Sequence, residues 1–163
     1  MKTKTSTETV EKTELELYNV NEKYFGKYGF LKDSELILIE IANNYFVLDE
    51  EKVYFYINDN NIYINNIYDD KKYNVNFDND ITFSYLDEEI TFKKVFFINN
   101  NLNGGEYDGV VYFFYDNFPE LSSPSKDSSI FIGWYEEDVL IEAINENRDY
   151  NLEAKYDTYL PWV

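Results

Sequence analysis

Short apolar runs, many of them alternating with polar residues, follow one another along most of the chain. In KVYFYI, alternate residues belong to opposite faces, with Val53, Phe55 and Ile57 on one and Tyr54 and Tyr56 on the other. This period of two is typical of half-buried strands. We therefore predict strands over residues 35–42, 44–49, 52–57, 62–68, 73–77, 81–86, 90–98, 110–115 and 130–135.

Turn-forming sequences separate several of these runs. They are NDNN at residues 58–61, DDKK at 69–72, DND at 78–80 and DEE at 87–89. Asn and Asp favour turns because their side chains bond nearby backbone and tolerate left-handed conformations. Short strands at regular spacing predict an antiparallel meander sheet, built either as a sandwich or as a half-barrel.

One segment near the end has helical spacing. In EEDVLIEAINENR, Leu140, Ile141 and Ile144 would share one helical face. Acids at the start and Arg148 at the end suit the helix dipole. We predict one C-terminal helix around residues 136–148, so the expected fold class is α+β, mostly β.

The length of 163 residues suits one domain. Residues 1–12 are polar and carry no apolar stripe, so we expect a flexible tail there and a single globular domain over 13–163. The start has no signal-peptide pattern, and no segment reaches about 18 apolar residues. We therefore expect a cytoplasmic protein that has no membrane partner.

Composition removes several kinds of chemistry. The chain has no Cys and no His, which excludes disulfides, thiolate or imidazole metal sites and Ser-His-Asp catalysis. Its 32 acids and 14 bases give a net charge of −18, which repels nucleic acids and attracts cationic proteins. Acidity also keeps proteins soluble, and that interpretation stays open. We expect no enzyme activity, no cofactor and no metal site.

The stretch NNNLNGGEYDGVVYFFYD (residues 99–116) contains an adjacent glycine pair. Glu106 and Asp108 would repel a phosphate, and no Lys stands at P-loop spacing. Read as a calcium loop, it has Val110 where the bidentate Glu belongs. The pattern favours a turn before a strand, with Glu106, Tyr107 and Asp108 at a tip that could enter a basic cleft.

Aromatic residues supply the other candidate contacts, since the chain has 17 Tyr and 13 Phe. Tyr54, Tyr56 and Tyr63 would line a face rich in Tyr and Asn, as in antibody paratopes, unless a second layer covers them. A further cluster consists of Trp134, Tyr135, Glu136, Glu137 and Asp138. It is either an aromatic anchor ringed by carboxylates or a core Trp before a helix.

The stretches NNNLNGGEYDGVVYFFYD and FIGWYEEDVLIEAI, in a small acidic chain, resemble bacterial immunity proteins that protect cells from polymorphic toxins. The resemblance implies a non-catalytic inhibitor that occludes a basic toxin, most naturally a nuclease. Its carboxylates would replace phosphates. The alternatives are a phage- or plasmid-encoded DNA mimic that inhibits a host enzyme, and a carbohydrate- or calcium-binding module. The protein would be a monomer, or a homodimer paired through exposed strand edges.

Overall fold

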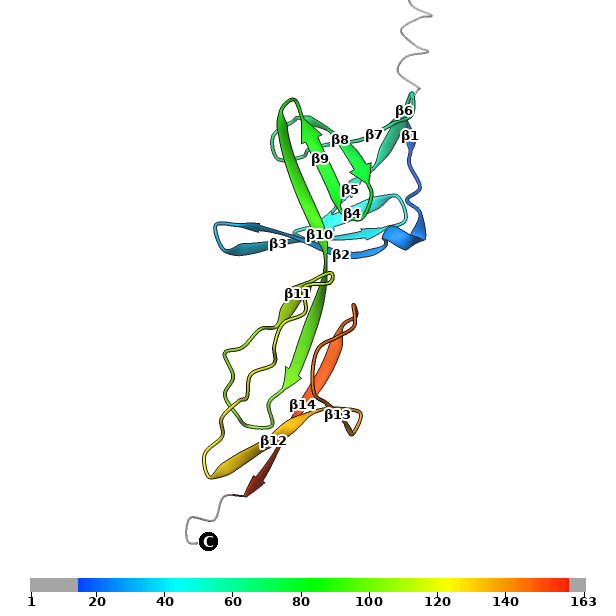
Figure 1. Cartoon of the computed structure of the whole chain (residues 1–163). Helices are drawn as coiled ribbons and strands as arrows, with labels where there is room; N and C mark the ends of the chain where they lie inside the picture. Colours follow the sequence, from blue (N-terminus) through cyan, green and yellow to red (C-terminus); the bar gives the residue numbers. More distant parts are fainter. Residues whose placement is uncertain (1–14, 159–163) are drawn as a thin grey trace, which may run out of the picture. The chain divides into compact units, whose positions relative to one another are not determined.

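The computed structural model describes residues 15–158, which divide into two compact units. The first unit ends at Lys94 and the second begins at Val95 (Figure 1). The described part of the expected domain over 13–163 thus consists of two units. The expected tail over residues 1–12 lies outside the described residues.

The first unit is a single antiparallel sheet. Along it the strands follow the order β1-β6-β7-β8-β9-β10-β2-β3-β4-β5, and the path stays open. Its elements are β1 (Glu16–Leu17), the 3-10 turn η1 (Glu22–Tyr24), β2 (Gly26–Lys32), β3 (Glu35–Ala42), β4 (Tyr45–Leu48), β5 (Glu51–Tyr54), β6 (Tyr56–Asn58), β7 (Asn61–Asn65), β8 (Lys72–Phe77), β9 (Ile81–Tyr85) and the first part of β10 (Glu88–Asn101). The mostly β, antiparallel prediction is therefore confirmed.

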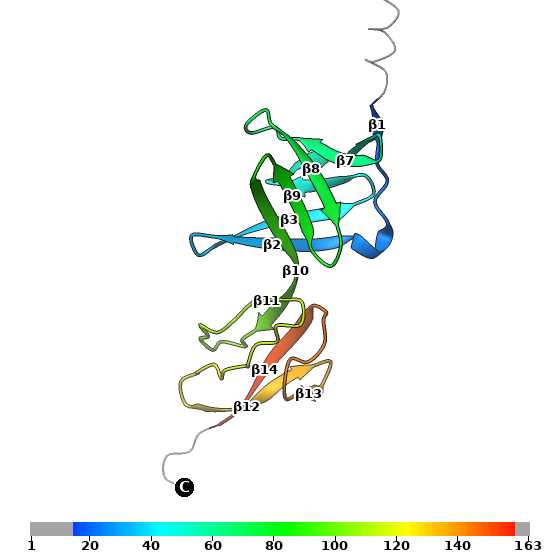
Figure 2. The same ribbon diagram turned by 45° about the horizontal axis from the view of Figure 1, so that its top comes forward.

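The core of the first unit forms because this sheet folds over on itself. In Figure 2, β8, β9 and β10 cross over β2 and β3. Between them the ring of Phe83 lies 5.4 Å from that of Phe46 and 5.6 Å from that of Phe92, measured between centroids. Phe55, which separates β5 from β6, is fully buried. Its backbone bonds Asn44 and Tyr18, so both ends of the path are tied to one core.

Tight turns account for part of the acidity. Four hairpins turn through two residues that both have positive φ, namely Asp33–Ser34, Asp49–Glu50, Asp59–Asn60 and Glu137–Asp138. Such turns match the twist of the flanking strands and favour Asp and Asn over most other residues. These acids shape hairpins whether or not they also meet a partner.

The second unit is a smaller sheet with the order β11-β10-β14-β12-β13. It consists of the second part of β10 with β11 (Tyr112–Phe114), β12 (Ser129–Glu136), β13 (Val139–Ile141) and β14 (Tyr150–Thr158). Strands β10 and β14 are parallel, and the other pairs are antiparallel. A separate core contains Ile98, Phe113, Trp134, Tyr150 and Leu152.

The predicted helix over residues 136–148 is wrong. Glu136 ends β12, and Glu137 and Asp138 turn the chain so that Leu140 pairs with Tyr135 across the hairpin. Leu140 is 47% exposed, so the three residues of the supposed helical face are not buried together. Pairing with β12 overrides the helical spacing. None of the helical turns in the described chain is long and apolar enough to span a membrane.

Candidate partner-binding surface

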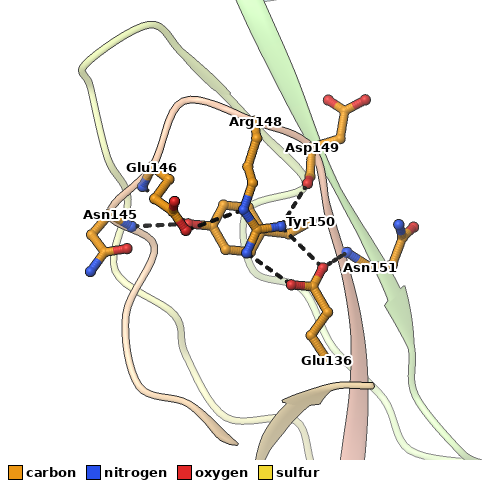
Figure 3. Close-up of polar contacts among 7 residues, drawn as sticks. All are labelled: Glu136, Asn145, Glu146, Arg148, Asp149, Tyr150 and Asn151. Carbon is orange, nitrogen blue, oxygen red and sulfur yellow. Dashed lines mark hydrogen bonds and ion pairs between the residues drawn. The ribbon is translucent and has the colours of Figure 1, made fainter. Parts of the chain in front are cut away.

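An ion-paired arginine organises the loop that replaces the predicted helix. Arg148 donates from Nη2 to Glu136 Oε1 at 2.8 Å and from Nη1 to Glu136 Oε2 at 3.2 Å (Figure 3). Its guanidinium lies 3.8 Å from the centroid of the Tyr150 ring, a cation–π geometry. This fork-to-fork pairing fixes both the angle and the distance between the two side chains.

Backbone groups complete this cluster. The hydroxyl of Tyr150 accepts hydrogen bonds from the backbone N–H groups of Asn145 and Glu146, at 3.2 and 3.0 Å (Figure 3). The N–H of Asn151 donates to Glu136 Oε2 at 2.8 Å. The hydrogen bond from Arg148, with this N–H bond, holds the pKa of Glu136 below its usual value. Glu136 therefore serves the fold internally.

The two lysines of the second unit are also engaged. Lys155 Nζ lies 3.0 Å from Asp138 Oδ1 and 4.5 Å from the centroid of the Tyr135 ring. The Asp138 hydrogen bond raises the pKa of Lys155. Lys126 Nζ donates to the carbonyl oxygen of Asn103 at 2.8 Å and lies over the ring of Tyr156.

These contacts leave the second unit with a large surplus of negative charge. Lys126, Arg148 and Lys155 are its only basic residues in the sequence, against thirteen acids. The acids are Glu106, Asp108, Asp116, Glu120, Asp127, Glu136, Glu137, Asp138, Glu142, Glu146, Asp149, Glu153 and Asp157. Most are exposed, so their field extends into solvent and favours cationic partners.

Exposed apolar side chains lie among these acids. Ile130 and Ile132 of β12 are 51% and 52% exposed, and Leu140 of β13 is 47% exposed. The register of β12 against β14 shifts between Phe131 and Gly133, so a β-bulge interrupts the alternation there. We call Ile130, Ile132, Tyr135 and Leu140, with the neighbouring acids Glu137 and Asp157, the outer face.

Part of this face has an open edge. Within residues 15–158, strand β13 pairs with Trp134, Tyr135 and Glu136 and with no other residues. The preceding residues of β12, from Ser129 to Phe131, pair with β14 alone among the described strands. Unpaired N–H and C=O groups at such an edge can accept a further strand.

The structure divides the predicted cluster at residues 134–138 between core and surface. Trp134 is 3% exposed and donates its indole N–H to the Ser122 carbonyl oxygen at 3.0 Å. Tyr135 is half-buried beneath Lys155. Glu137 and Asp138 are exposed in the hairpin turn. Only part of the cluster is therefore available to a partner.

The loop over residues 102–111 is fastened to the unit. Glu106 and Ser125 form a β-bridge with two backbone hydrogen bonds of 2.7 and 2.9 Å. Tyr107 makes an edge-on contact with the Trp134 ring at 5.2 Å between centroids. The side chains of Glu106 and Asp108 remain exposed, so the predicted tip is accessible on an ordered support.

The three predicted tyrosines of the first unit differ in exposure. Tyr54 is 37% exposed and meets Tyr45 edge-on at 5.7 Å. Tyr56 is half-buried beside Tyr63 at 5.8 Å. Tyr63 is 3% exposed, with Lys72 Nζ 3.8 Å from its ring centroid. Tyr54 offers the most accessible area of the three.

No protein-family description, curated protein or solved structure matches the chain. Among residues 15–158, no group of three or more acidic residues is arranged to hold a metal ion. Sequence reasoning missed Ile130, Ile132 and Leu140 as surface residues. A sequence signal for exposed apolar residues was present in IFIGWY (residues 130–135), because this strand has apolar residues on both faces and only one face can be buried in a single sheet layer.

Proposed function

We propose that the protein is a non-catalytic, acidic inhibitor that binds a cationic protein and occludes its functional site through the outer face of the second unit. The observation that carries this proposal is the engagement of Lys126, Arg148 and Lys155 within the unit. With these bases held, a basic partner meets mainly carboxylates, which speeds encounter and selects against anionic competitors.

The apolar part of the outer face supplies contact area that a partner can bury, which charged side chains alone do not provide. Ile130, Ile132 and Leu140 provide area that a partner can bury, while Glu137 and Asp157 form a charged rim. Interfaces gain most of their affinity from such an apolar centre within a polar surround. A DNA mimic would need carboxylates in place of phosphates throughout its surface, so the exposed Ile130 and Ile132 favour an inhibitor whose interface has an apolar centre.

The partner class that fits best is a toxin with a basic active site, above all a nuclease whose site is built to hold phosphates. The inhibitor would then act stoichiometrically, as an immunity protein does. Calorimetric titration against the product of the adjacent upstream gene tests this, together with the loss of that product's nuclease activity at one equivalent. Binding weaker than micromolar would refute this pairing.

Charge reversal identifies the surface. We expect Glu137→Lys with Asp157→Lys to slow association by about tenfold or more at low salt, because both acids border the outer face. The matched control is Asp33→Lys with Asp59→Lys, which changes net charge equally in hairpin turns of the first unit. Equal slowing by both pairs would contradict the outer face as the binding surface.

A further inference from the structure

The core of the first unit contains an apolar cavity. Its volume is about 110 Å³. Its walls are almost entirely aliphatic and aromatic, from Ile39, Phe46, Leu48, Ile64, Tyr73, Phe83, Ile90 and Phe92, with Asn66 as the one amide. Engineered apolar cavities of about 150 Å³ bind benzene, so this space suits a short alkyl chain or a small ring.

A wider hollow of about 780 Å³ borders the cavity. Leu48, Asn66, Ile90 and Phe92 line both spaces, so the cavity and the hollow lie side by side. The hairpin of β2 and β3 forms one wall and projects beyond the neighbouring strands of the first unit (Figures 1 and 2). The outer volume falls within the range of about 300–1,000 Å³ for small-molecule sites.

The loop over residues 66–71, which borders the hollow, is tied by hydrogen bonds. The backbone N–H of Asn66 donates to the Lys71 carbonyl oxygen at 2.7 Å, and the N–H of Asp70 donates back to the Asn66 carbonyl oxygen at 3.0 Å. The Asn66 side chain accepts from the N–H of Tyr68 at 2.8 Å. A mouth ordered in this way costs a ligand little conformational entropy.

The charges at the mouth favour a cation over an anion. Glu35 and Asp49 line the hollow, against Lys32 alone. Desolvation, and then the charges of Asp49 and Glu51, raise the pKa of the Tyr68 phenol. The ring of Tyr68 is 59% exposed and could also receive an ammonium group on its face.

We propose that the first unit binds a small amphiphile, whose apolar body of about six carbons occupies the cavity and whose ammonium head group lies at the mouth near Glu35, Asp49 and Tyr68. The site is independent of the proposed inhibitor function, because all of its residues belong to the first unit. Either one can therefore fail while the other stands.

Three six-carbon probes that differ only in head group test the site: hexylammonium, hexan-1-ol and hexanoate. Each is titrated into the full chain labelled at isoleucine δ1 methyls. We expect chemical-shift changes at Ile39, Ile64 and Ile90, which line the cavity, while Ile98, Ile130 and Ile144 of the second unit serve as internal controls. The expected Kd for hexylammonium is about 0.1–1 mM, and about tenfold weaker for hexanoate.

Substitutions test separately the apolar cavity and the charged mouth of the site. Leu48→Trp fills the entrance to the cavity and should weaken hexylammonium binding by about tenfold or more. Leu86→Trp adds the same indole at a position that is 84% exposed and lines neither space, so its affinity should be unchanged. Glu35→Gln with Asp49→Asn should bring hexylammonium and hexanoate to within about threefold of each other.

Two results would overturn the proposal. One is the absence of shifts at the three cavity methyls up to about 10 mM hexylammonium, ten times the weakest Kd expected for that probe. The other is hexanoate binding as tightly as hexylammonium. If Leu48→Trp disturbs the methyl spectrum of the first unit, Ile90→Phe replaces it, and unchanged affinity in that variant also overturns the cavity assignment.

Discussion

Each basic residue of the second unit lies against a tyrosine ring and bonds an acid or a backbone carbonyl. Arg148 packs on Tyr150, Lys155 on Tyr135 and Lys126 on Tyr156. The apolar stem of a long cation covers such a ring while its charged end satisfies a polar group. In a chain with 32 acids and 14 bases, all three cations of the second unit make contacts within that unit.

The Glu136–Arg148 pair predicts a specific dependence of stability on pH. The folded-state pKa of Glu136 lies below its ordinary 4.5. Its contribution to stability is therefore complete above about pH 5 and is lost as pH falls through the lowered folded value. We expect Glu136→Gln to reduce the free energy of unfolding by about 1 kcal/mol at pH 7, since Arg148 is partly exposed.

Urea unfolding of both proteins between pH 7 and pH 3 checks this. The difference in unfolding free energy between wild type and Glu136→Gln should shrink towards zero at the acid end. Glu142→Gln is the control, because Glu142 is exposed and forms no ion pair within residues 15–158. A difference that stays constant with pH would show that packing, and not ionisation, carries the effect.

At the scale of elements, a near-continuous apolar run predicted one strand closely and alternation predicted another. The expected strand over 35–42 coincides with β3, and that over 73–77 lies within β8. Strand β14 was missed although Tyr150, Leu152 and Ala154 alternate with polar residues, because its polar face is long and charged. The helix failed because the Glu137–Asp138 turn and the pairing of β13 depend on β12, which local spacing does not report.

The turn between β9 and β10 carries an avoidable strain. Leu86 has a φ of 55° and is 84% exposed, so its side chain gains little from packing while its backbone is left-handed. We expect Leu86→Gly to raise the free energy of unfolding by about 1 kcal/mol. Asp87→Gly in the same turn should not stabilise, because Asp87 lacks a positive φ. Chemical denaturation measures the free energy of unfolding of both variants. An equal change in the two would contradict the conformational explanation.

The bulge in β12 requires glycine. Gly133 has a φ of 153°, and a Cβ there would lie 2.7 Å from Leu140 Cδ1. We expect Gly133→Ala to destabilise the second unit by about 1–2 kcal/mol, from backbone strain and this contact. In the Leu140→Ala background, Gly133→Ala should cost less unfolding free energy, because the contact with Leu140 Cδ1 is gone. A double-mutant cycle measured by thermal unfolding gives this difference. If the free-energy changes of the two substitutions are fully additive, the whole cost of Gly133→Ala comes from backbone strain.

For the molecule as a whole, composition predicts a strongly negative charge but not which acids are available to a partner. The eleven predicted contact residues fall in both units, and Trp134 and Tyr63 are buried. What composition could not reveal is that several acids form hairpin turns and that the cations of the second unit are all engaged. Strict alternation would place Trp134 on the same face as Ile130 and Ile132, and the bulge between Phe131 and Gly133 lets Trp134 be buried while the two isoleucines are exposed.

A net charge of −18 makes the folded state and the proposed complex respond to salt in opposite directions. Screening weakens repulsion among the acids, so raising NaCl from 0.05 to 0.5 M should raise Tm by about 2–4 °C. The same change should slow association with a cationic partner by about tenfold or more, because long-range attraction is screened too. Circular-dichroism melts and stopped-flow association in NaCl and in KCl measure both. A falling Tm would mean that the few ion pairs outweigh the repulsion, while salt-independent association would remove charge as the basis of partner selection.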